Sequence, residues 1–301
     1  AAAREPVERL CVLDGSLLLC RAYHAVPSLT GAGGRPVNAA FGFAKTLLKI
    51  RRELPSAFGL VAFDRFFGSA PTGEWPKDRP PRRALFAGYK GHRKPPPEDL
   101  LAQMKLTKAL CVEAGLACIT SPAGSEADDV IASCVATARS EGIPSLIVTS
   151  DKDLLQLVAD AAPAVRWAAP GRLDEPWGER QVCEAFGLAR PSQLADLLAM
   201  AGDACDGVPG LPSIGPKIAM RLLEEYGDLE AILAAAAAGS TAVKGLGARR
   251  LAALREHAEA ARLYREVVAL RSDLPTPSME QLRWRPPSDL RRRLARCGGF
   301  P

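Results

Sequence analysis

Carboxylate side chains, which can bind cations or help to activate water, recur directly after short apolar runs of this chain. Such runs are typical of buried parallel strands, and the carboxyl ends of parallel strands meet at one edge of a sheet. Two further acids, Asp203 and Asp206, flank Ala204-Cys205 in a glycine-rich turn. We therefore expect nine carboxylates from distant parts of the sequence to meet. Those that follow the apolar runs are Asp14, Asp64, Glu126, Asp128, Asp129, Asp151 and Asp153.

Nine carboxylates at one place could not all stay ionised unaided, because each negative charge raises the pKa of its neighbours. Divalent cations remove this conflict, and all-oxygen ligands favour Mg²⁺ or Mn²⁺ over zinc or copper. Two such ions about 3.5–4 Å apart can activate a water and stabilise the leaving oxygen of a phosphodiester. A single acid such as Asp128 or Asp129 could instead be a helix cap or turn former. As a set, the acids favour a metal centre.

Basic side chains are concentrated in two segments of a chain whose formal net charge is +5. For residues 77–94 we favour contacts with phosphate, and for residues 283–296 we favour an ordinary solvated face or tail. The first segment holds Lys77, Arg79, Arg82, Arg83, Lys90, Arg93 and Lys94 against Asp78 alone. The second holds Arg283, Arg285, Arg291, Arg292, Arg293 and Arg296 against Asp289 alone.

A glycine- and proline-rich turn at 207–219 leads into an expected helix. Pro216 suits the first helical position, and Gly215 allows a ligand to approach the backbone. The N–H groups of the helix start, with Lys217, could hold phosphate oxygens of a duplex without reading its sequence. A plain helix–turn–helix connection is the alternative, and a weaker copy of the pattern stands at 245–252. The candidate DNA contacts in this turn are Gly210, Ser213, Ile214, Gly215 and Lys217.

The elements that position these side chains follow from alternating strand-like and helix-like patterns, which predict an α/β fold with a mostly parallel sheet flanked by helices. We place an α/β core at 1–190, including an irregular, basic segment at 67–97, and a helical region at 191–301. The expected strands are Leu10–Leu13, Gly59–Phe63, Leu116–Thr120, Ser145–Thr149 and Ala164–Trp167. The expected helices are Ala39–Glu53, Glu98–Ala114, Ala127–Glu141, Pro191–Met200, Pro216–Tyr226, Leu229–Ala238 and Ala248–Leu270.

Several classes of protein are disfavoured by the composition. No run of 18 uncharged apolar residues is present, so we expect no transmembrane helix. The eight cysteines form no C-x-x-C pair and the three histidines are scattered, which argues against a zinc site. The cysteines within apolar runs indicate a reducing, intracellular compartment, and a bacterial cytoplasm or an organelle matrix fits equally.

Six motifs are specific enough to compare with known families. They are Leu13-Asp14-Gly15-Ser16 with Arg21-Ala22-Tyr23-His24-Ala25, Ala62-Phe63-Asp64, Tyr89-Lys90-Gly91-His92-Arg93, Glu126-Ala127-Asp128-Asp129-Val130, Ser150-Asp151-Lys152-Asp153 and Gly202-Asp203-Ala204-Cys205-Asp206. Together they resemble the 5′ nuclease family, meaning the 5′–3′ exonuclease domain of bacterial DNA polymerase I and the related flap endonucleases. The resemblance runs from about Leu10 to Trp284.

This resemblance implies a PIN-like nuclease core and, at about 196–226, the family's helix–three-turn–helix element, which binds duplex DNA with help from a monovalent cation such as K⁺. It also implies two Mg²⁺ ions, for which Mn²⁺ can substitute. The implied ligands of the first ion are Asp14, Asp64, Glu126 and Asp128. Those of the second are Asp151, Asp153, Asp203 and Asp206, with Asp129 in support.

Basic and aromatic residues receive roles from the same resemblance. Lys90 and Arg93 would stabilise charge on the scissile phosphate. Tyr89 would stack on a terminal base, and Arg21 would help to position the 5′ strand. We assign His92 to ordinary packing or to the surface.

The sequence departs from the family's usual pattern in two places. The stretch between Asp64 and Tyr89, which forms the family's arch over a 5′ single strand, is longer and richer in proline and arginine. Gly207 stands where an asparagine is usual, and we expect a looser turn there with no ligand lost. The sequence ends at Pro301 without polymerase motifs, which fits either a stand-alone nuclease or a domain of a larger protein.

The expected activity is Mg²⁺-dependent hydrolysis that leaves a 5′-phosphate and a 3′-hydroxyl. The expected substrates are DNA with 5′ flaps, nicks or RNA-primer junctions, in replication and repair, and we expect a monomer without membrane contact. Two alternatives remain open at this stage. One is a DNA-junction-binding module without catalysis, and the other is an RNA-directed nuclease of the same fold.

Overall fold

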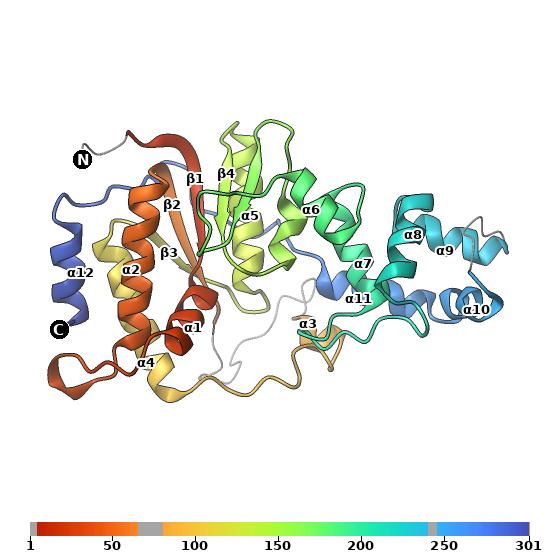
Figure 1. Ribbon diagram of the computed structural model, residues 1–301, viewed down its shortest axis with the longest axis horizontal. Coiled ribbons are helices and arrows are strands. Elements are labelled where there is room, and N and C mark those ends of the chain that lie inside the picture. The colour runs from red at the N-terminus through yellow and green to blue at the C-terminus, as the bar shows by residue number, and fades with distance from the viewer. Residues whose placement is uncertain (1–4, 66–80, 240–245, 301) are drawn as a thin grey trace.

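An α/β half is followed by a helical half in the computed structural model, which describes residues 5–65, 81–239 and 246–300 (Figure 1). The five strands of the described residues form one parallel sheet in the order β3-β2-β1-β4-β5, which confirms the expected α/β fold with its parallel sheet. The strands are β1 (Val7–Asp14), β2 (Ser56–Phe63), β3 (Ala117–Thr120), β4 (Ser145–Val148) and β5 (Val165–Ala168).

Helices cover both faces of this sheet, and the last helix, α12, returns to pack against this half after the helices α7 to α11. Those of the first half are α1 (Gly15–Ala25), α2 (Asn38–Glu53), α3 (Arg82–Leu85), α4 (Glu98–Glu113), α5 (Ala127–Ser140) and α6 (Glu179–Phe186). Those that follow are α7 (Leu194–Ala201), α8 (Pro216–Tyr226), α9 (Leu229–Ala238), α10 (Ala248–Glu256), α11 (Ala258–Val268) and α12 (Leu290–Gly298). Short 3₁₀ turns are η1 (Ala32–Gly34), η2 (Asp153–Leu157) and η3 (Pro191–Gln193).

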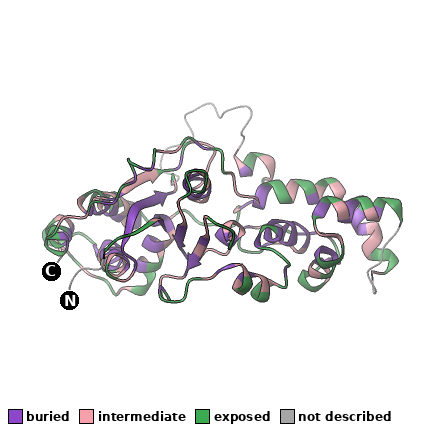
Figure 2. Cartoon of the chain, turned by 90° about the horizontal axis from the view of Figure 1, so that it is seen from above, coloured by how far each residue is buried: buried purple, intermediate pink, exposed green. Residues whose placement is uncertain are grey.

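Alternate residues of the strands supply two separate cores, because successive strand side chains point to opposite faces. Leu10 and Val12 belong to the core that contains α5 and continues into the helical half. Cys11 and Leu13 belong to the core beneath α1, α2, α4 and α12. Figure 2 shows the strands largely buried between helices whose outer faces are exposed. The sheet is thus fixed from both sides, so its carboxyl edge can hold charged groups in place.

The order of the strands marks one position on that edge. From β1 the chain goes to β2 and β3 on one side and then to β4 and β5 on the other, so the topology switches between β1 and β4. Open α/β sheets bind ligands outside the carboxyl ends at such a switch point. Asp14 is the last residue of β1, and Asp151 comes three residues after the end of β4. The two acids therefore flank the position at which this fold class binds ligands.

The helical half differs from expectation at residues 248–270, among other places. The pattern over 248–270 predicted a single helix, but α10 ends at Glu256 and α11 begins at Ala258. His257, between them, leaves helical geometry with φ −111° and ψ 22°. Its N–H is bonded to the carbonyl of Ala253, and its carbonyl accepts from Ala261, so both helices keep their terminal hydrogen bonds across the break. The helices α1, α3, α6 and α12 were not anticipated.

Candidate active site

Four aspartates gather at the switch point, each from a different element. The carboxylate of Asp14 accepts hydrogen bonds from the backbone of Leu17 at 3.0 Å, which caps α1, and from Thr149 Oγ1 at 2.8 Å. Asp64 follows β2 and accepts a 2.8 Å bond from the N–H of Ala127 at the start of α5. The strand ends and helix starts are thereby tied together. The group that we name the first carboxylate group consists of Asp14, Asp64, Asp128 and Asp151.

Electrostatic strain is concentrated in this first carboxylate group. Burial raises the pKa of Asp14 and of Asp128, and the nearby charges of Asp64 and Asp151 raise both further. Burial also raises the pKa of Asp64. Buried like charges favour protonation unless cations are present. Buried carboxylates this near one another therefore favour a bound cation at this place.

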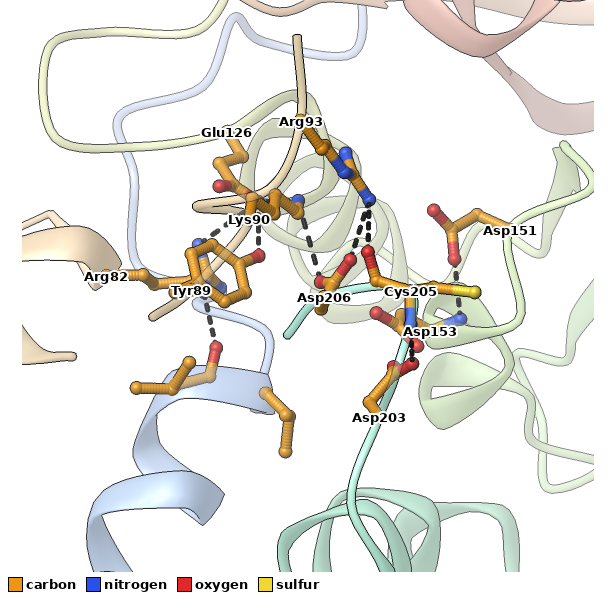
Figure 3. Close-up of polar contacts among 12 residues, drawn as sticks. Arg82, Tyr89, Lys90, Arg93, Glu126, Asp151, Asp153, Asp203, Cys205 and Asp206 are labelled. Carbon is orange, nitrogen blue, oxygen red and sulfur yellow. Dashed lines mark hydrogen bonds and ion pairs between the residues drawn. The ribbon is translucent and has the colours of Figure 1, made fainter. Parts of the chain in front are cut away.

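A second carboxylate group joins the two halves of the molecule. Asp153, at the start of η2, lies with Asp203 and Asp206 of the α7–α8 connection, and oxygens of all three lie within 4.8 Å of one another. Burial, followed by the charge of Asp151, raises the pKa of Asp153 to about 6. Asp151 accepts the N–H of Asp153 at 2.9 Å and connects the two groups (Figure 3).

The chemistry of these donors decides which metal they fit. All are carboxylate oxygens, with no thiolate or imidazole among them, and Asp14, Asp153, Asp203 and Asp206 are buried. Hard divalent cations are the ions that such oxygens bind. Among the described residues, Asp153, Asp203 and Asp206 lie close enough together to hold a divalent metal ion at the carboxyl edge of the sheet.

Basic side chains of the 81–97 segment face both groups. Lys90 Nζ lies 2.8 Å from Glu126 Oε2 and 3.7 Å from Asp206 Oδ2, and Arg93 Nη2 lies 2.7 Å from Asp206 Oδ1. Lys90 has a left-handed backbone with φ +50°, and its N–H donates to the carbonyl of Asp206 at 2.7 Å. Strained backbone of this kind persists only where its surroundings hold it, and it is concentrated at functional sites. Arg93 is 51% exposed, so it can also reach a ligand from solvent.

Two expected roles do not fit the geometry. Both oxygens of Asp129 are engaged by Arg82, at 2.7 and 2.8 Å, and the carboxylate is fully buried, so it faces away from the metal groups. Tyr89 is only 4% exposed and its hydroxyl donates to Glu126 at 2.9 Å, so its ring is not available to stack on a base. Asp129 and Tyr89 therefore hold Arg82 and Glu126 in place and do not contact a ligand themselves.

Glu126 occupies an intermediate place, as the N-cap residue of α5. Burial acts to raise its pKa, but Lys90 and Arg82 outweigh this and lower it. It is thus a charged group held between the basic segment and the first carboxylate group. Arg21, expected to position a 5′ strand, bonds to Ser150 beside Asp151, and so lies at the rim of the site.

Two residues near the carboxylates, Thr149 and Lys152, had no role in the sequence interpretation, and a third, Arg82, was expected to contact phosphate but is buried. Lys152 contacts Asp153 and Asp203, Thr149 holds Asp14, and Arg82 holds Asp129. Lys152 stood inside a recognised motif and Arg82 inside a recognised basic segment, so the signal for both was present. A pattern of residue types, however, does not say which acid a given base meets.

The α7–α8 connection brings Asp203 and Asp206 to the site by a tight turn. Asp203 and Val208 exchange backbone hydrogen bonds at 2.7 and 2.9 Å. Gly210 has φ +71°, and a Cβ there would lie 2.4 Å from the nitrogen of Gly202, so only glycine fits. This position is occupied by neighbouring backbone, which makes Gly210 a structural residue of the turn.

The start of α8 is more open than the rest of this connection. Gly215 is the N-cap residue, Pro216 follows as the first helical residue, and no atom lies within 4 Å of a Cβ built at Gly215. Ser213 and Lys217 are exposed, whereas the side chain of Ile214 is 2% exposed and belongs to the core. An anion could approach the helix start at Gly215 and Lys217, and Ile214 can offer only its backbone.

Comparison with known proteins agrees with this fold. Residues 9–187 match the family model of the 5′–3′ exonuclease N-terminal resolvase-like domain, and residues 189–290 match that of the 5′–3′ exonuclease C-terminal SAM fold. The chain belongs to the 5′–3′ exonuclease family. A 5′–3′ exonuclease of Aquifex aeolicus is 34% identical over 227 residues, which are 75% of this chain and 73% of that protein.

Longer relatives are polymerases. The thermostable DNA polymerase I of Thermus aquaticus is 42% identical over 230 residues. The DNA polymerase I of Rhizobium leguminosarum is 37% identical over 277 residues. These matches cover 76% and 89% of this chain but 25% of each polymerase. The chain thus spans about a quarter of the length of these two relatives.

Solved structures share the fold at low sequence identity. The bacteriophage T5 5′-exonuclease with bound zinc has a TM-score of 0.66 at 19% identity, covering 96% of this chain and 98% of that one. The catalytic core of Rad2 in complex with DNA substrate has a TM-score of 0.61 at 17% identity, covering 98% and 88%. No helix within the described residues is long and apolar enough to cross a membrane.

Proposed function

We propose that this chain is a Mg²⁺-dependent 5′ nuclease that hydrolyses phosphodiester bonds near 5′ ends of branched or nicked DNA. The observation that carries the proposal is the meeting of carboxylates from both halves at the switch point of the sheet, opposite Lys90 and Arg93. A module that only binds DNA junctions would need the basic residues and the α7–α8 turn, but not these buried acids. The acids cost stability in the ion-free protein, so their presence supports catalysis.

The residues divide the chemical work as follows. Asp14, Asp64, Asp128 and Asp151 would hold one ion, with Glu126 beside it, and Asp153, Asp203 and Asp206 would hold the other. When bound there, two Mg²⁺ ions would supply Lewis acidity and a water of lowered pKa. Lys90 and Arg93 turn from their carboxylate partners to the scissile phosphate and stabilise its growing negative charge.

The substrate is gripped on its backbone. Gly215 and Lys217 at the start of α8 present N–H groups and a positive charge to one strand of a duplex, with a monovalent cation such as K⁺ in support. A related structure holds a DNA substrate, which supports the same class of ligand here. The products are a 5′-phosphate and a 3′-hydroxyl, and the enzyme acts as a monomer in a bacterial cytoplasm or an organelle matrix.

Product mapping on labelled 5′-flap, nicked and gapped duplexes, with Mg²⁺ or with EDTA, tests this function. We expect metal-dependent cutting near the 5′ end. We also expect Asp151→Asn to bind flap DNA as wild type does while cutting at least 100-fold more slowly, on the order of the loss of a main electrostatic group. Asp174→Asn, an exposed acid outside the site, is the matched control. Absence of cutting by the folded wild type would reject the proposal, and faster cutting of RNA flaps would reassign the substrate.

A further inference from the structure

Lys152 lies inside the second carboxylate group, although its neighbours Asp151 and Asp153 are the residues that the function uses. Its Nζ is 3.0 Å from Asp153 Oδ1 and 2.5 Å from Asp203 Oδ2. Asp153 belongs to the α/β half and Asp203 to the α7–α8 connection. One ammonium group therefore joins the two halves at a place where oxygens of three buried carboxylates lie within 4.8 Å.

This contact differs from an ordinary surface ion pair in two respects. The two partner carboxylates are 12% and 3% exposed, so their attraction for a cation is weakly screened. The Lys152 side chain itself is 34% exposed, and a four-carbon stem lets its ammonium group move to solvent without moving the backbone. The ammonium is thus bound on one side and free to leave on the other.

We propose that Lys152 is an internal counter-cation of the second carboxylate group, which holds Asp153 and Asp203 together in the ion-free protein and is displaced when a divalent ion binds. The inference rests on the proposed function, because it takes these carboxylates to be ion ligands. An ammonium and a metal ion cannot both use the same oxygens, so the lysine weakens binding of the ion. The same lysine prevents the two halves from repelling each other before the ion arrives.

Lys90 does not duplicate this arrangement. Its ammonium group is nearest Glu126, at 2.8 Å, and only 3.7 Å from Asp206, so it faces the first carboxylate group and the edge of the second. Lys152 bonds to two of the three clustered carboxylates. Removal of the Lys152 charge therefore affects the second ion position selectively.

Calorimetric titration of the full chain with Mg²⁺ in the absence of DNA tests the proposal. Lys152→Met keeps the length of the stem and removes the charge, and we expect it to bind Mg²⁺ about tenfold more tightly at one position, which corresponds to about 1.4 kcal/mol. Its melting temperature in EDTA should fall below that of wild type, and saturating Mg²⁺ should remove the difference. Lys105→Met, on the exposed face of α4, removes the same charge far from the acids and should change neither quantity.

A measurement on the wild-type chain makes the test independent of how the variant folds. Reductive methylation followed by mass spectrometry should show Lys152 reacting faster with Mg²⁺ present, because its ammonium group is then released to solvent. Equal or weaker Mg²⁺ binding by Lys152→Met, or protection of Lys152 by Mg²⁺, would overturn the inference while leaving the nuclease function intact. A wild-type chain that binds no Mg²⁺ would instead reject the proposed function.

Discussion

Asp128 and Asp129 are neighbours in the sequence, yet the structure gives them opposite electrostatic surroundings. Burial raises the pKa of Asp128, as do the charges of Asp14 and Asp151. Burial acts on Asp129 in the same direction, but Arg82 outweighs it and lowers the pKa. Consecutive residues of a helix point about 100° apart, so Asp128 faces the first carboxylate group and Asp129 faces the buried Arg82. The sequence motif contains both acids and cannot tell the ligand from the support.

Gly207, which stands where an asparagine is usual in the family, lies close to the turn that carries Lys90. It has φ +73°, and a Cβ there would lie 2.6 Å from the carbonyl oxygen of Gly88. Gly88 precedes Lys90 in the same turn, so at Gly207 the backbones of the two turns approach closely. The looser turn expected from the sequence is not what this close contact indicates. The glycine instead allows the basic segment to approach the α7–α8 connection.

Gly207→Asn, which restores the usual residue of the family, should therefore harm this chain. We expect a loss of about 1–3 kcal/mol in the free energy of unfolding, because the new side chain forces two backbones apart. Urea denaturation measures the loss. Gly142→Asn is the control, since Gly142 has φ +78° and nothing within 4 Å of a Cβ. Equal losses in both variants would show that the positive φ, and not the contact with Gly88, is responsible.

At the scale of elements, Arg82 connects three parts of the chain. Its guanidinium group bonds to Asp129 near the start of α5 and to the carbonyls of Val267 and Ala269 at the end of α11, each at 2.7–2.8 Å. Arg82 itself begins α3, and it is 4% exposed. The basic segment, the helix that carries Asp128 and the end of α11 are thus joined at one buried ion pair.

Arg82→Met should leave the Asp129 carboxylate buried without its partner. We expect a loss of about 3–5 kcal/mol in the free energy of unfolding, measured by urea denaturation. Adding Asp129→Asn removes the buried charge and keeps an oxygen for one of the two N–H groups, of Glu126 and of Arg271, that the carboxylate accepts. The double variant should therefore be more stable than Arg82→Met alone. If the two losses simply add, the pair is not coupled and the proposed junction is wrong.

The start of α8 yields a prediction about DNA rather than stability. Lys217→Ala should weaken binding of duplex DNA equally for all sequences and reduce the slope of log affinity against log salt by about 1. The physical reason is the loss of one phosphate contact and its released counterion. Fluorescence anisotropy across a salt series measures it, with exposed Lys105→Ala as the control. An unchanged slope would remove the helix start from the DNA interface.

Sequence patterns predicted the elements far better than the contacts between them. The strands at 10–13 and 59–63 are right because their continuous apolar residues fit a sheet covered on both faces, and the acids that follow them then had to share an edge. The sequence did not reveal α1, because Asp14 both ends a strand and caps a helix. The partners of Lys152 and Arg82 depend on how the halves pack, and no local periodicity contains that information. Residues 66–80, where we expected most of the arch, lie outside the described residues.

At the scale of the whole molecule, the site exists only when both halves are folded together. Asp153 comes from one half and Asp203 and Asp206 from the other, and bonds from Lys90 and Lys152 cross between them. The core on the α5 side of the sheet also continues without interruption into the helical half. Packing of apolar residues therefore stabilises the contact between the two halves, and repulsion between the carboxylates destabilises it. The balance between the two depends on pH and on divalent ions.

In EDTA, the chain should lose stability as pH rises from about 4.5 to 7. Asp153 has a folded pKa of about 6 against an ordinary value of 3.8, so the folded protein binds its proton more tightly than the unfolded one. The resulting stabilisation is complete below pH 4 and is lost as pH passes 6, by about 3 kcal/mol for this group. Burial raises the pKa of Asp14 too, which adds in the same direction.

Mg²⁺ should reverse this trend, because an ion binds the deprotonated carboxylates and only in the folded state. Glu126 and Asp129, whose pKa values are lowered, act in the opposite direction near pH 4.5 and are ionised in both states at neutral pH, where they contribute no slope. Urea denaturation at pH 5, 6, 7 and 8, in EDTA and in Mg²⁺, should therefore give curves that diverge with rising pH. Parallel curves would mean that ion binding does not release the protons of Asp153 and Asp14, and the acids would then have to be explained without a metal.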